Sequence, residues 1–217
     1  MTKNISRIFL LIIIFYSYGC ESYNSRFFKQ ENYNEQINEY HYSDIRYYPI
    51  GGIKQKVKKI DYDRNDIIRK ETFFRNNQIH KIKLYNESGK ILKEDIYKDS
   101  ESKGYRIIYY SNGNVKEEYD FNSFNIKTGK FTSYYHNGGL QSDLEYSDGS
   151  LSGTCSWYYP SGNLMKIKDY LDNSFMYQIE YYKNGSKKSE GGFKEKKLSG
   201  RWIFYDKNGD LTSEEDY

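Results

Sequence analysis

A short turn signal recurs along this chain at nearly constant spacing, and it constrains the fold more than any other feature. Each signal ends in glycine, and successive glycines lie 23 to 25 residues apart. A degenerate copy, Asn65-Asp66, precedes the first of them. The signals are Ser88-Gly89, Asn112-Gly113, Asn137-Gly138, Ser161-Gly162, Asn184-Gly185 and Asn208-Gly209. A period of roughly 20–50 residues indicates an array of identical supersecondary units, so the sequence predicts seven units over residues 57–217.

Each unit reads as a strand, a tight turn and a second strand. Asn-Gly between apolar segments favours a hairpin turn, because both residues tolerate positive φ. A second glycine marks several junctions between units, at Gly104, Gly129, Gly153 and Gly200. We therefore expect an all-β fold, an elongated array of antiparallel hairpins that forms one twisted meander sheet.

Aligning the units on their turns reveals a fixed internal pattern. Tyrosine lies four residues before the turn glycine in every unit, at Tyr62, Tyr85, Tyr109, Tyr134, Tyr158, Tyr181 and Tyr205. An aliphatic residue lies two residues after it in six units, with Lys187 as the exception. An aromatic lies eight residues after it, at Phe74, Tyr97, Phe121, Tyr146, Tyr170, Phe193 and Tyr217. The aliphatic and the later aromatic are an even number apart and should share a face, which we expect the early tyrosine to join.

The opposite face carries a second row of large side chains, most of them aromatic. Its members are Ile108, Tyr110, Tyr135, Trp157, Tyr159, Tyr182, Trp202 and Phe204. Exposed aromatics rimmed by polar groups mark binding surfaces. The candidate binding residues are Tyr110, Tyr135, Trp157, Tyr159, Tyr182 and Trp202. The alternative is that these rings are a second layer of structural packing, or lie under residues 21–56.

Residues 1–20 have the pattern of an export signal. Lys3 and Arg7 precede nine apolar residues, Ile8–Tyr16. This run is too short to cross a roughly 30 Å hydrocarbon core as a helix, and it is typical of a secretory signal peptide. Residues 20–56 lack a clear period, and we interpret them as a tether or weakly ordered lead-in.

The residues Ser17-Tyr18-Gly19-Cys20 resemble the lipobox of bacterial lipoproteins, in which the signal, here residues 1–19, is removed and the cysteine is lipidated. The resemblance implies a lipid anchor at Cys20 that holds the chain in the bacterial cell envelope, at the outer membrane or the cell surface. The alternative is an ordinary cleaved signal with an incidental cysteine. Cys155 is then unpaired, and we expect it to be small, buried and unreactive.

The segments Tyr134–Leu140 and Tyr181–Gly185 resemble the variant MORN repeat of bacteria, and Gly153–Tyr159 and Gly200–Tyr205 resemble its Gly-x-Trp-x-x-Tyr segment. The resemblance covers about three quarters of the chain. It implies a hairpin array. Bacterial members are often labelled antitoxins of the YwqK type, and eukaryotic ones are associated with membrane attachment and protein assembly.

The sequence offers no candidate catalytic residue, metal site or cofactor. The three histidines, His41, His80 and His136, are not at metal-ligand spacing, and no phosphate-binding glycine loop or nucleophile motif occurs. Without Lys3 and Arg7, 31 basic side chains stand against 30 acidic ones, whereas nucleic-acid binding requires a clustered basic excess.

These observations predict a non-enzymatic interaction module, anchored to the envelope, that binds a protein or a glycan through its repeat surface. A second hypothesis is an antitoxin or immunity protein that neutralises a toxin by direct contact. An envelope enzyme is a third. The sequence does not specify the oligomeric state.

Overall fold

The computed structural model describes residues 26–34, 39–50, 53–99, 103–171 and 174–217. Within these ranges the chain forms sixteen β-strands. They are β1 (Arg26–Asn34), β2 (Glu39–Ile50), β3 (Ile53–Tyr62), β4 (Ile68–Arg75), β5 (Gln78–Tyr85), β6 (Ile91–Asp99), β7 (Lys103–Tyr109), β8 (Val115–Phe121), β9 (Lys127–Tyr134), β10 (Leu140–Ser147), β11 (Ser150–Tyr158), β12 (Leu164–Leu171), β13 (Ser174–Tyr181), β14 (Lys187–Lys194), β15 (Lys197–Tyr205) and β16 (Leu211–Asp216). None of these residues forms a helix of the length and apolar character needed to cross a membrane.

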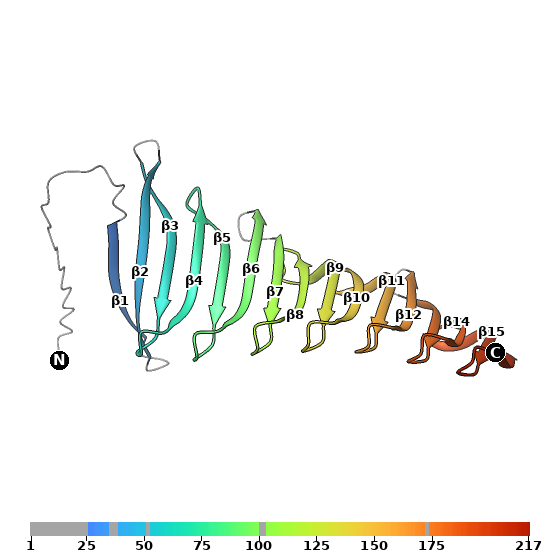
Figure 1. The fold of residues 1–217 in the computed structure, drawn as a ribbon. Coiled ribbons are helices and arrows are strands. Elements are labelled where there is room, and N and C mark those ends of the chain that lie inside the picture. Colours follow the sequence, from blue (N-terminus) through green and yellow to red (C-terminus); the bar gives the residue numbers. More distant parts are fainter. Residues whose placement is uncertain (1–25, 35–38, 51–52, 100–102, 172–173) are drawn as a thin grey trace, which may run out of the picture.

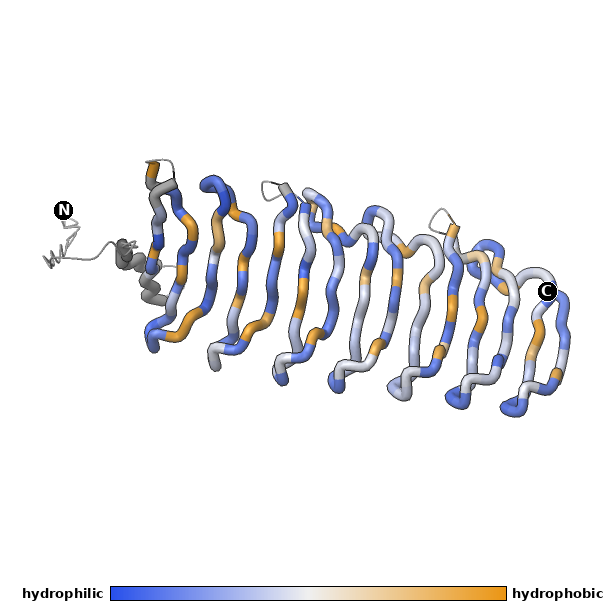
Figure 2. The backbone as a smooth tube through the Cα atoms, turned by 45° about the horizontal axis from the view of Figure 1, so that its top comes forward, coloured by the Kyte–Doolittle hydropathy of each residue, from blue (hydrophilic) through white to orange (hydrophobic). Residues whose placement is uncertain are grey.

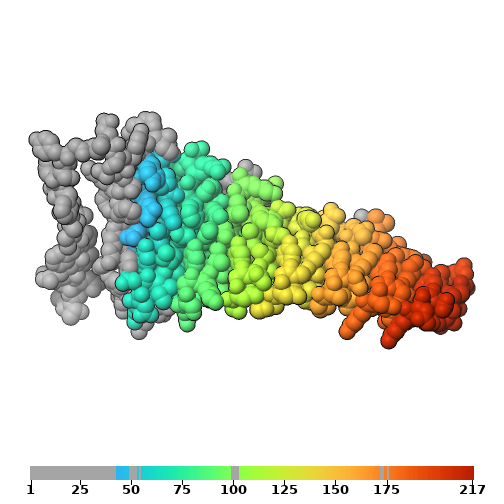
Figure 3. Space-filling model, in the orientation of Figure 1, coloured from blue at the N-terminus to red at the C-terminus, as the bar shows by residue number. Residues whose placement is uncertain are grey.

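All sixteen strands belong to one antiparallel sheet in which each strand pairs only with its neighbours in sequence. The colours therefore run in order from blue to red along the array (Figure 1). The sheet twists along its length, as paired L-residue strands do, and the space-filling view shows an elongated body (Figure 3). The predicted all-β meander of hairpins is confirmed, with seven hairpins from β3–β4 to β15–β16.

The tether predicted for residues 20–56 is wrong for the part of it that the structure describes. Strands β1 and β2 lie there, and β2 pairs with β3 over most of its length. Ile45 and Ser43 of β2 are buried at 9% and 1% exposure, so this segment extends the sheet and its core. The predicted signal peptide and Cys20 lie outside the described residues.

A β-bulge beside every repeat turn decides which side chains share a face. In β7–β8, Ile108 pairs with Glu117 and Tyr109 pairs with Val115, which leaves one extra residue in β8. Paired residues point to the same side of a sheet. The bulge therefore places Val115 and Phe121 on opposite faces although their spacing is even. Tyr109 does join Val115, as expected, but the prediction that the later aromatic joins them is wrong.

The later aromatics instead pack on the face that carries residues five and seven positions before the turn glycine. We call this side the aromatic face. Tyr119 stacks on Phe131 with ring centroids 5.8 Å apart, and Phe131 meets Tyr146 edge-on at 5.7 Å. Leu144 and Cys155 complete the buried cluster, with Cys155 at 0% exposure. The expectation of a buried Cys155 is confirmed, and burial raises the pKa of its thiol.

A second cluster on the same face forms around Trp202, which is 4% exposed. Its ring meets Phe193 edge-on at 5.2 Å, and its Nε1 donates a 3.0 Å hydrogen bond to the carbonyl of Gly192. The ring lies directly over Gly191, where an added Cβ would come within 2.2 Å of it. Only glycine at position 191 leaves room for this indole.

Candidate binding surface

The seven repeat turns line one edge of the sheet, and all share one backbone geometry (Figure 2). In the turn after β7, Gly113 N donates to Tyr110 O at 2.9 Å, and Tyr110 N donates to Asn114 O at 2.8 Å. Gly113 has a φ of +94°, whereas Asn112 does not have a positive φ. The turns are therefore of the three-residue type with one left-handed residue, so only the glycine of each pair uses the positive φ that both residues tolerate. Asp66, with a φ of +61°, takes the glycine's place in the degenerate turn.

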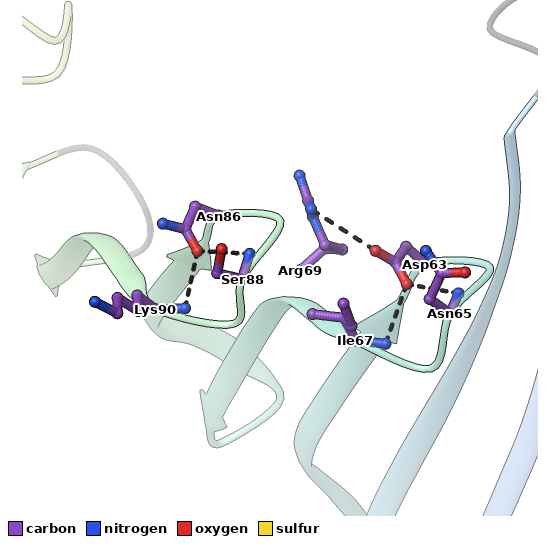
Figure 4. Close-up of polar contacts among 7 residues, drawn as sticks. All are labelled: Asp63, Asn65, Ile67, Arg69, Asn86, Ser88 and Lys90. Carbon is purple, nitrogen blue, oxygen red and sulfur yellow. Dashed lines mark hydrogen bonds and ion pairs between the residues drawn. The ribbon is translucent and has the colours of Figure 1, made fainter. Parts of the chain in front are cut away.

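The side chain three residues before the turn glycine stabilises the turn in one of two ways. Figure 4 shows the first way, in which Asp63 Oδ1 accepts hydrogen bonds from the backbone of Asn65 and Ile67. Asn86 does the same for Ser88 and Lys90 in the next turn. These carboxylate and amide groups satisfy backbone donors of their own turn.

In the second way, tyrosine occupies that position and reaches the next hairpin. Its hydroxyl donates to the carbonyl of the tyrosine that lies four residues before the next turn glycine. The four bonds run from Tyr110 to Tyr134 at 2.8 Å, from Tyr135 to Tyr158 at 2.6 Å, from Tyr159 to Tyr181 at 2.9 Å and from Tyr182 to Tyr205 at 3.0 Å. We call these four residues the edge tyrosines. They are half-buried, so each ring is fixed and keeps part of its surface open.

Turn amides connect neighbouring turns in parallel with the edge tyrosines. Asn112 Nδ2 donates to His136 O at 3.0 Å, and Asn184 Nδ2 donates to Lys207 O at 2.7 Å. Their Oδ1 atoms accept from the backbone two residues further along their own turns. The turn edge is therefore one hydrogen-bonded surface and not a row of independent loops.

The six predicted binding residues separate into two groups. Tyr110, Tyr135, Tyr159 and Tyr182 are the edge tyrosines and lie together along the turn edge. Trp157 packs against the buried cluster of the aromatic face, and Trp202 is buried in the second cluster. The six rings therefore do not form a single exposed stripe, since the bulges move the two tryptophans into the packing of the sheet.

The opposite side of the sheet, which we call the carboxylate face, holds an arrangement that sequence reasoning missed. An acidic residue lies five positions after the turn glycine in six units, at Glu71, Glu94, Glu118, Asp143, Glu190 and Glu214. The early tyrosine of the next unit donates to it in four cases, from Tyr85 to Glu71 at 2.6 Å, from Tyr109 to Glu94 at 3.0 Å, from Tyr134 to Glu118 at 2.7 Å and from Tyr205 to Glu190 at 3.1 Å. The signal was present in the sequence as the recurring acid at that position.

In the six units that carry the acid, a lysine, tyrosine or arginine eight residues before the turn glycine completes these contacts. Lys58 pairs with Glu71 at 2.5 Å, and Lys81 pairs with Glu94 at 2.7 Å. Burial alone would raise the pKa of Glu94, yet hydrogen bonds from Lys81 and Tyr109 outweigh it and lower that pKa. Burial and the bond to Glu94 together raise the pKa of Tyr109 to about 12. Glu94 is thus an ionised structural acceptor between units.

The described part of the sheet does not gather its metal-ligating side chains into one centre. No group of three His, Cys, Asp or Glu side chains there could hold a metal ion. His80 contacts the Phe73 carbonyl and His136 lies in a turn, in separate parts of the sheet. The surface has shallow depressions, one of which is lined by Tyr159, Met165, Lys166, Glu180, Tyr181 and Lys188.

The fold and its hydrogen-bonded edge define an all-β repeat protein built from hairpins. Five of its segments match the MORN repeat variant: residues 81–99, 103–123, 127–148, 151–172 and 198–217. These matches fall on five of its seven hairpins, which are therefore similar to MORN repeats. Of the two unmatched hairpins, β3–β4 has the degenerate turn, and β13–β14 has Lys187 at the aliphatic position. No curated protein matches the chain.

Proposed function

We propose that this chain is a non-enzymatic interaction module that binds a protein or glycan partner through its repeat surface. The observation that supports this most strongly is the single-layer sheet itself. Its strands pair only with their sequence neighbours, so neither face is covered by a second layer within the described residues. Repeat arrays of this shape offer extended binding surfaces.

The turn edge is the part of this surface best prepared for binding. The hydroxyls of the edge tyrosines are bonded to the backbone, which fixes the rings before a partner arrives. A fixed aromatic ring loses little conformational entropy on binding. Exposed lysines stand beside these rings, for example Lys116 near Tyr110 at 6.0 Å.

We further propose that the chain is exported and anchored in the bacterial envelope through a lipid on Cys20. The support is the sequence of residues 1–20, with its basic start, apolar run and Gly19-Cys20. Metabolic labelling with a radioactive fatty acid tests this. The wild-type chain should incorporate label and Cys20→Ser should not; equal labelling of both, or none of the wild type, contradicts the anchor.

The interaction role is tested by binding of the purified chain to a glycan panel and to envelope proteins. Tyr135→Leu with Tyr159→Leu should remove binding while the circular dichroism spectrum stays unchanged. Binding that survives these substitutions and also survives changes on both sheet faces argues against a repeat-surface partner. Rescue of cells from the toxic product of an adjacent gene would instead favour the antitoxin hypothesis.

A further inference from the structure

The edge tyrosines occupy four consecutive hairpins, and the described hairpins on either side differ from them. Position three before the turn glycine is Asp63 and Asn86 in the two preceding hairpins and Asp206 in the last. Those short side chains bond to their own turns. The four tyrosine turns between them are therefore a distinct block within an otherwise uniform array.

The same block differs from its neighbours in charge. The seven residues that begin with each edge tyrosine contain no Asp or Glu: residues 110–116, 135–141, 159–165 and 182–188. They contain Lys116, Lys183, Lys187 and Lys188, together with His136. The equivalent segments 63–69, 86–92 and 206–212 all contain acids. Because the chain as a whole is nearly neutral, this edge is a local basic surface.

The basic groups and the rings are accessible together. Lys116, Lys183 and Lys188 are exposed, and the rings are half-buried. A shallow depression beside Tyr159 also contains Met165, Lys166 and Glu180. Glu180 already accepts a hydrogen bond from Gln178 at 2.8 Å and pairs with Lys188 at 3.1 Å, so its charge is compensated.

The spacing of the rings sets the geometry of a partner. Equivalent residues in successive hairpins are two strands apart, or roughly 10 Å at about 4.8 Å per strand. The partner should therefore present similar groups at regular intervals along an extended line. A linear polymer of identical units does this, whereas the surface of a folded protein without internal repeats does not.

We infer that the turn edge from Tyr110 to Lys188 binds a linear, negatively charged polysaccharide. The C–H faces of its sugar rings stack on the edge tyrosines, whose π faces carry partial negative charge. Its carboxylates pair with the lysines beside those rings. This inference rests on the proposed function and names the class of partner.

The experiment measures binding of the full-length chain, purified in detergent, to oligomers of alginate, hyaluronate and polygalacturonate of graded length. Dextran serves as the neutral glycan, and polyglutamate serves as an acidic polymer without sugar rings. One variant combines Tyr135→Leu and Tyr159→Leu, and a second, conservative variant combines Tyr135→Phe and Tyr159→Phe. A charge variant combines Lys116→Gln, Lys183→Gln and Lys188→Gln. Its matched control changes three exposed lysines at the junction end, Lys194, Lys196 and Lys197, to Gln.

At least one anionic glycan should bind, with affinity that rises with length and exceeds that for dextran and polyglutamate. The Leu variant should lose about tenfold or more in affinity, while the Phe variant, which keeps the rings but not the hydroxyl bonds that fix them, should lose much less. The charge variant should lose about tenfold and the control much less. The inference is overturned if no anionic glycan binds, if dextran or polyglutamate binds equally well, or if the Leu variant is unaffected. If a protein or a neutral glycan then binds, and its binding requires the repeat surface, the proposed function holds although this inference fails.

Discussion

The hydroxyl of Tyr109 donates a 3.0 Å hydrogen bond to Glu94, a carboxylate of the preceding hairpin. Tyr85, Tyr134 and Tyr205 make the same contact one hairpin apart. In these four units the tyrosine of the repeat is therefore a connector between units and not a core residue of its own hairpin. Its aromatic ring fills the sheet surface, and its hydroxyl specifies which hairpin lies next to it.

Removing one such hydroxyl should destabilise the chain measurably. A hydrogen bond to a charged acceptor contributes about 1.5–3 kcal/mol, so Tyr109→Phe should lower the free energy of unfolding by an amount near the lower end of that range. Tyr158→Phe is the matched control, because the Tyr158 hydroxyl makes no hydrogen bond among the described residues and Asp143, a shorter acid, stands at the equivalent position. Urea denaturation measures both variants; equal losses would contradict the connector role.

Acid should weaken the carboxylate face. The pKa values of Glu71, Glu94 and Glu190 lie below their ordinary 4.5, because bonds from lysines and tyrosines outweigh burial. Groups with a lowered native pKa stabilise the fold fully above the ordinary value, and this contribution is lost as the pH falls through the native pKa. Stability measured by urea unfolding should therefore fall below pH 4.5, and Glu94→Gln should reduce that dependence. A pH-independent stability across this range would contradict the assignment.

High pH should break the same tyrosine–carboxylate contacts by ionising the tyrosine. The hydrogen bond to Glu118, helped by burial, raises the pKa of Tyr134 from 10.0 to about 12. A raised native pKa means that its stabilisation is complete below pH 10.0 and is lost as the pH rises through about 12. Phenolate absorbance of the folded chain should show a late-titrating class of tyrosines, and Tyr134→Phe should remove one member of it. If Tyr134→Phe instead removed a tyrosine that titrates early, the result would contradict the raised pKa of Tyr134.

Packing around Trp202 provides a test of the aromatic face. Gly191→Ala places a Cβ 2.2 Å from the indole ring, so the ring must move. Overpacking of this kind costs about 1–3 kcal/mol. Gly139→Ala is the control, because that glycine has no positive φ and its nearest neighbour is the flexible Asn137 side chain at 3.3 Å. Thermal unfolding should separate the two variants; equal stability would show that Trp202 does not pack on Gly191.

Much of the fold follows from the sequence, because turn glycines at a constant period fix the number of hairpins and their order. The face assignment does not, since alternation fails wherever a bulge adds a residue. Lys116 is the extra residue of the bulge in β8, and its residue type does not distinguish it from its neighbours. For the same reason Trp157 and Trp202 were placed on a binding surface, whereas they pack in the sheet. Strands β1 and β2 were missed because they lack the turn signal.

The candidate surface was predicted in part. The four edge tyrosines were found by their position in the repeat, but their hydroxyl bonds to the next hairpin depend on the pitch of the sheet. The recurring acid at Glu71, Glu94 and Glu118 is visible in the sequence, but its contacts are not. Its pairing with a tyrosine more than a dozen residues away becomes visible only when neighbouring hairpins are brought into register.

The distance between turns in solution tests the central claim most directly, namely that successive hairpins join edge to edge in one continuous sheet. Spin labels at pairs of turn positions, such as Asn112 with Asn137, Ser161, Asn184 or Asn208, report these separations by pulsed dipolar spectroscopy. The continuous sheet predicts that each added hairpin lengthens the separation by roughly 10 Å, less a small reduction from twist. Separations that stop growing or shrink as hairpins are added would show a compact or closed arrangement and contradict it.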